Sequence, residues 1–75
     1  MNNTLSPEEF NRRLNRVVRA VKEETREDPY FGARHIAKRT GFSNVLVGYY
    51  LPRINENAKD ITVQKISNRT WKRTE

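Results

Sequence analysis

Residues 32–54 have the sequence GARHIAKRTGFSNVLVGYYLPRI, and this stretch decides the fold. Its first half places the apolar Ile36 and the small Ala37 on one face of a short helix. Gly41 ends that helix, because glycine takes a left-handed C-cap without steric cost. Ser43 is a good N-cap for a second helix. The stretch therefore predicts two short helices that cross at a steep angle around a glycine.

The two helices are expected over residues 33–40 and 43–55. Apolar side chains recur in the second at the spacing of one helical face: Val47, Tyr50, Leu51 and Ile54. Pro52 removes a backbone hydrogen bond and clashes with the carbonyl one turn back, so this helix kinks there or stops near Tyr50. Because Ile54 keeps the apolar stripe in phase, we favour a kink or a second short turn.

A longer helix is expected before this pair, over residues 6–26. Ser6 suits its N-cap and Pro7 its first position, and the Glu9 carboxylate can return a hydrogen bond to the Ser6 amide. One face of this helix is apolar: Phe10, Leu14, Val17, Val18 and Val21. Pro29 follows its end, because the residue before a proline avoids the helical region. We expect this helix to cover the other two.

A β-hairpin is expected over residues 61–74, where β-branched residues alternate with polar ones. A two-residue turn would pair Ile66 with Trp71. A three-residue turn instead puts three apolar side chains on one face: Ile61, Val63 and Trp71. We favour the three-residue turn because it buries more apolar area. A two-stranded hairpin is not stable alone, so Trp71 is expected to anchor it to the helices.

Three helices followed by a basic hairpin are the order of elements in a winged helix. The sequence resembles the helix-turn-helix of DNA-binding proteins at six positions: Ile36, Ala37, Gly41, Phe42, Val47 and Tyr50. It is similar to small archaeal winged-helix proteins at Ile36, Ala37, Gly41, Val47, Gly48, Thr70 and Trp71. The resemblance implies one mostly helical α+β domain, residues 1–75, with a three-helix helix-turn-helix core and a two-stranded C-terminal wing. Pro52 in the third helix and a short wing tip depart from that pattern.

The excess positive charge lies in one part of the chain. The 75 residues carry a net charge of +6. Residues 1–30 hold six basic and six acidic side chains, whereas residues 31–75 hold nine basic and three acidic ones. This asymmetry indicates a polyanionic partner, such as double-stranded DNA, for the helix pair and the hairpin. A basic surface without a partner is the alternative that charge alone leaves open.

The resemblance implies that the second helix of the pair enters the DNA major groove. Base contacts are predicted from its outer face: Asn44, Val45, Gly48, Tyr49 and Arg53. Asn44 suits an adenine edge, Val45 a thymine methyl, and Gly48 a close approach. Phosphate contacts are predicted from Arg34, Lys38, Arg39, Ser43, Lys65, Arg69, Lys72 and Arg73. About five such contacts give a slope of log K against log salt of roughly −4 to −5.

Other classes of function have little support. The chain has no Cys, one His and no Gly-rich phosphate loop, and His35 has no carboxylate within helical reach. We therefore predict no catalytic residue, no cofactor and no metal site. No apolar run approaches the ~18 residues of a membrane span, and the polar residues 1–5, expected to be frayed, begin no signal peptide. We expect a cytoplasmic protein with no membrane contact and no small-molecule ligand.

Three functions remain open. The first is a sequence-specific DNA-binding transcriptional regulator, for which a homodimer on a two-fold site is compatible. The second is a protein-interaction winged helix, in which Val45 and Tyr49 form an apolar docking patch beside Gly48. The third is a DNA- or RNA-binding protein without sequence preference. Gly48 also has a purely structural alternative, which is packing against the first helix.

Overall fold

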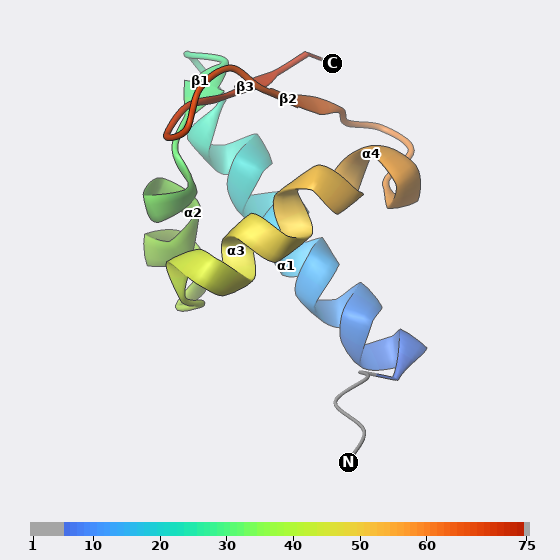
Figure 1. The fold of residues 1–75 in the computed structure, drawn as a ribbon. Coiled ribbons are helices and arrows are strands. Elements are labelled where there is room, and N and C mark those ends of the chain that lie inside the picture. Colours follow the sequence, from blue (N-terminus) through green and yellow to red (C-terminus); the bar gives the residue numbers. More distant parts are fainter. Residues whose placement is uncertain (1–5, 75) are drawn as a thin grey trace.

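The computed structural model describes residues 6–74, and the polar end at residues 1–5 lies outside this range. The chain is a mostly helical α+β protein with a small antiparallel sheet. Its elements follow in the order α1 (Pro7–Glu24), β1 (Tyr30–Phe31), α2 (Ala33–Thr40), α3 (Asn44–Tyr50), a 3-10 turn (Leu51–Arg53), α4 (Ile54–Asn57), β2 (Val63–Lys65) and β3 (Trp71–Arg73). The strands gather at one end of the molecule, and α3 crosses α1 near the middle (Figure 1).

Helix α1 begins as predicted and ends earlier. The Ser6 hydroxyl accepts a hydrogen bond from the Glu9 amide at 3.1 Å, with Pro7 in the first turn. The predicted end at residue 26 is wrong, because α1 ends at Glu24. The Thr25 hydroxyl donates to the Val21 carbonyl at 2.7 Å, and its amide donates to the same oxygen. The Thr25 backbone leaves the helical region, with φ of −105° and ψ of +23°, and the helix ends there.

The turn between α2 and α3 has the predicted geometry. Gly41 takes a left-handed conformation with φ of +80° and donates its amide hydrogen to the Ala37 carbonyl at 2.8 Å. The Ser43 hydroxyl then accepts from the Leu46 amide at 3.0 Å and caps α3. Helix α1 also reaches this turn, because the Arg16 guanidinium donates to the Thr40 carbonyl at 2.7 Å. The sequence did not suggest this last contact.

The predicted single helix over residues 43–55 is three consecutive pieces. Helix α3 ends at Tyr50, one 3-10 turn holds Pro52, and α4 begins at Ile54. Proline lacks the amide hydrogen that an α-helical bond needs at this point, so the backbone tightens for one turn. The second short turn favoured from the sequence is therefore confirmed, and the apolar stripe stays in phase through it.

The sheet has three strands in the order β1-β3-β2, so the prediction of a two-stranded hairpin is incomplete. Strand β1 pairs with β3, with Phe31 opposite Trp71, and β2 pairs with β3 on its other side. Residues 67–69 form the β2–β3 turn, so the three-residue turn is confirmed over the two-residue alternative. The connection after α1 therefore contributes strand β1. A strand of two residues shows no alternating pattern in the sequence, so it was not predicted.

One core joins the helices to the sheet. The predicted stripe is fully buried at all four positions: Val47, Tyr50, Leu51 and Ile54. The predicted sheet anchors are buried as well: Ile61, Val63 and Trp71. The Tyr50 ring packs against Phe10 with centroids 5.4 Å apart, and its buried hydroxyl has no hydrogen-bond partner among residues 6–74. With this stripe turned inward, the opposite side of α3 must face solvent.

Candidate nucleic-acid interface

The outer face of α3 carries four of the predicted base-contacting residues: Asn44, Val45, Gly48 and Tyr49. All four are exposed, and Val45 shows 83% of its surface and Tyr49 46%. The seven residues of α3 include no charged side chain. This face is therefore open and uncharged, and it presents an unusually bare apolar side chain at Val45.

Gly48 has no packing role against the part of the chain that the structure describes, residues 6–74. A Cβ atom built at this position would meet no heavy atom within 4 Å outside its own helical neighbourhood. Its backbone needs no glycine either, since Gly41 has the only positive φ among residues 6–74. A glycine inside a helix is less favourable than alanine by about 1 kcal/mol. The alternative that Gly48 packs against α1 is thus excluded.

Arg53 is occupied within the molecule. Its guanidinium carbon lies 3.7 Å from the centroid of the Tyr49 ring, and the same group donates a hydrogen bond to the Tyr49 carbonyl. The Tyr49 ring also contacts Tyr50 edge-on at 5.1 Å. Arg53 therefore closes the end of α3 and holds Tyr49 in place, instead of extending toward a partner as the sequence suggested.

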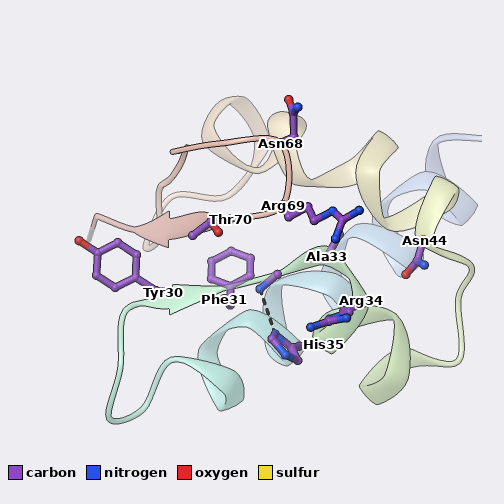
Figure 2. A pocket seen from close by; sticks show the side chains of 10 residues that line it. Tyr30, Phe31, Ala33, Arg34, His35, Asn44, Asn68, Arg69 and Thr70 are labelled. Atoms are coloured by element: carbon purple, nitrogen blue, oxygen red, sulfur yellow. Dashed lines mark hydrogen bonds between the residues drawn. The ribbon is translucent and has the colours of Figure 1, made fainter.

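Two adjoining hollows lie beside the start of α3. The first has a volume of about 690 Å³ and lies between β1, the start of α2 and the β2–β3 turn (Figure 2). Arg34 and Arg69 reach this opening from opposite sides, and Asn44 stands at its edge (Figure 2). The second hollow runs on between α2 and α3, where Lys38 and Ser43 line it. Together they form what we call the basic cleft, defined by Arg34, Lys38, Ser43, Asn44 and Arg69.

No carboxylate of the described residues 6–74 lines the basic cleft. Among the residues that border either hollow, the charged ones are Arg34, Lys38 and Arg69. The side chains of these three make no hydrogen bond or ion pair with any residue between 6 and 74. Five of the thirteen residues predicted to contact DNA therefore converge here, and the three cations among them have no neutralising partner within residues 6–74.

The start of α2 is shaped by a contact that the sequence analysis missed. The Gly32 amide donates a hydrogen bond to Nδ1 of His35 at 3.0 Å, so the imidazole caps the helix from its third position. A Cβ at Gly32 would lie 3.1 Å from the Arg69 carbonyl oxygen, so the β2–β3 turn packs directly on this glycine. Gly32 followed three residues later by His35 was the available signal for the cap.

The other predicted phosphate contacts lie elsewhere or have partners. Arg39 forms an ion pair with Glu24 at 2.6 Å, and Arg73 donates to the Thr25 hydroxyl at 3.3 Å. The Lys72 ammonium lies 5.5 Å from the centroid of the Tyr30 ring on the outer face of the sheet. Lys65 is exposed on the edge strand β2. None of these side chains lines the basic cleft.

A shifted pKa is found outside the basic cleft, at Asp60. The hydrogen bond from Lys22 holds the pKa of the Asp60 carboxyl below its ordinary value, with smaller help from the charge of Arg73. This pair connects α1 to the segment before β2. Within residues 6–74, no three metal-binding side chains cluster and no helix is long and apolar enough to cross a membrane.

Comparison with known proteins gives one match. No curated protein and no solved structure matches the chain. A family model described as a domain of unknown function, DUF7123, matches residues 1–74. This match spans all the elements described above, from α1 to β3. The chain therefore belongs to the DUF7123 family.

Proposed function

We propose that this protein binds double-stranded DNA as a winged helix and acts as a small transcriptional regulator. In this proposal α3 is the recognition helix and the β2–β3 hairpin is the wing. The order of helices and strands is compatible with that fold, and the crossing of α2 and α3 around Gly41 supports it.

The observation that carries the proposal is the basic cleft beside an uncharged helix face. The side chains of Arg34, Lys38 and Arg69 have no partner among residues 6–74, and no acid of that range lies among them. Phosphate contacts fix the position of a protein on DNA, whereas contacts to base edges give specificity. The cleft supplies the first kind of contact, and the outer face of α3 supplies groups for the second.

The arrangement suggests how a duplex would be held. A helix fits the major groove of B-DNA, where the edges of all base pairs are distinguishable. With α3 in that groove, Arg34 and Lys38 at the start and middle of α2 meet the phosphates of one strand. Arg69 on the β2–β3 turn meets the backbone on the other side of the cleft. Ser43 and Asn44, at the start of α3, then lie closest to the DNA.

Salt dependence tests the proposal directly. A fluorescein-labelled duplex is titrated with the protein at several salt concentrations, and anisotropy reports binding. Three cleft cations, with or without Lys65 and Lys72, give a slope of log K against log salt of roughly −3 to −5. An affinity that does not change with salt, or no binding at low salt, would rule out phosphate recognition by the cleft.

A second candidate function is the docking of another protein on α3. The observation in its favour is the apolar, uncharged outer face, with Val45 83% exposed beside the bare backbone of Gly48. Substitution of Tyr49 separates the two functions. If Tyr49→Ala abolishes a protein contact and leaves the affinity for duplex DNA unchanged, the docking function is correct.

A further inference from the structure

We infer that α3 recognises A·T base pairs, through the thymine methyl group and the adenine edge. The inference rests on the proposed binding of duplex DNA and names the class of site that the protein would select. It follows from what the outer face of α3 offers and from what it lacks.

The outer face of α3 lacks a reader of guanine. The commonest specific contact to guanine is a bidentate hydrogen bond from Arg or Lys. No residue of α3 is charged. Arg53, the nearest cation after it, stacks on Tyr49 and donates to the Tyr49 carbonyl. A G·C pair facing this helix would therefore meet no Arg or Lys of α3 that could donate the bidentate bond to guanine.

The same face offers partners for adenine and thymine. Asn44 is the first residue of α3 and is exposed beside the basic cleft. An asparagine amide can bond both N6 and N7 of adenine. Val45 is the next residue, and its isopropyl group is the barest large apolar side chain on residues 6–74. Burial of this side chain against the C5-methyl group of thymine removes both from water.

Gly48 leaves room for the thymine methyl group to approach α3. It lies one turn beyond Asn44 and Val45, and the space above it is open. The absence of a side chain lets a base edge approach the helix backbone at this point. Because no contact among residues 6–74 uses Gly48, a partner that fills that space is what offsets its cost in helix stability.

Removal of one methyl group from the DNA tests the inference. Anisotropy titrations compare a duplex of alternating A·T pairs with the same duplex in which uracil replaces thymine, at one salt concentration. We expect the thymine duplex to bind more tightly, by about fourfold for each methyl group buried. A duplex of alternating G·C pairs is expected to bind more weakly than both.

Variants assign the effect to this face. Val45→Ala should remove most of the difference between thymine and uracil duplexes. Ile66→Ala is the matched control, because Ile66 is an exposed aliphatic residue on the hairpin and outside α3, and it should leave the difference intact. Gly48→Ala should raise the melting temperature by about 4–8 °C and yet weaken binding to the A·T duplex.

The outcomes separate this inference from the proposed function. Equal affinity for thymine and uracil duplexes, or tighter binding to the G·C duplex, overturns A·T recognition and leaves duplex binding in place. The same holds if Val45→Ala and Ile66→Ala behave alike. If no duplex binds at low salt, the proposed function itself fails. Tighter binding by Gly48→Ala would show that nothing approaches α3 at that point.

Discussion

Helix α1 and the basic cleft both carry several basic side chains, but those side chains differ in whether they have partners. In α1, Arg12 and Arg13 both bond Glu9, and Arg16 bonds the Thr40 carbonyl. Lys22 of the same helix pairs with Asp60, and Arg26, which follows the helix, pairs with Glu23. Arg19 is the exception within α1. In the cleft, Arg34, Lys38 and Arg69 have no partner among residues 6–74. Pairing, more than the count of cations, therefore distinguishes the surface of α1 from the basic cleft.

The largest effect is expected when the unpaired cations are removed. The double variant Arg34→Ala/Arg69→Ala should lower the affinity for duplex DNA by roughly tenfold or more, because bonds to charged groups are the stronger ones. Its salt slope should be shallower by about 1.8, since two phosphate contacts are lost. Anisotropy titrations measure both quantities.

The matched control is Arg12→Ala/Arg13→Ala in α1. It removes the same charge from the chain, but both arginines already bond Glu9. Its affinity should stay within about twofold of the unmodified protein, as screening weakens exposed charges far from the DNA. Equal losses in the two double variants would mean that net charge alone drives binding, and the comparison would fail.

A smaller effect is expected when a paired cation is released. Arg39 belongs to α2 but is held by Glu24 of α1. Glu24→Gln should free Arg39 beside Lys38 and strengthen DNA binding by about threefold, with a salt slope steeper by up to ~0.9. Glu27→Gln removes the same charge from an exposed position that pairs with no cation in residues 6–74. If both variants strengthen binding equally, release of Arg39 is not the cause.

The smallest effect is expected on stability in acid, through the ion pair of Lys22 with Asp60. The pKa of Asp60 is lowered in the folded protein by Lys22, so folding is favoured by its ionised form. This contribution is present above the ordinary carboxyl pKa of 3.8 and is lost as the pH falls through the lower folded value. Thermal unfolding measured across that acidic range should show a slightly weaker pH dependence for Asp60→Asn. Arg69→Ala should follow the unmodified curve.

The fold was largely predictable from local signals. The apolar stripe of residues 47–54 and the caps at Ser6, Gly41 and Ser43 each depend on neighbours in sequence, and the structure confirms them. Strand β1 was not predictable, because two residues have no period and their pairing with β3 is long-range. The end of α1 was also missed, since it depends on how the Thr25 side chain turns.

The candidate site was predictable in part. Exposure of Asn44, Val45 and Tyr49 follows from the buried stripe alone. The engagement of Arg39 could not be foreseen, because it depends on where Glu24 of α1 lies in space. Arg53 follows Tyr49 by four residues, so their contact had a local signal that was missed. Charge counts treat every cation alike, and only the folded chain shows which ones are neutralised.

The central claim is that the basic cleft and the outer face of α3 together contact duplex DNA. Amide chemical shifts of the ¹⁵N-labelled protein, followed during titration with a duplex, test it most directly. We predict the largest changes in three segments: the start of α2, residues 43–49 and residues 67–69. Shifts confined to α1, or a spectrum that the duplex leaves unchanged at low salt, would contradict the account.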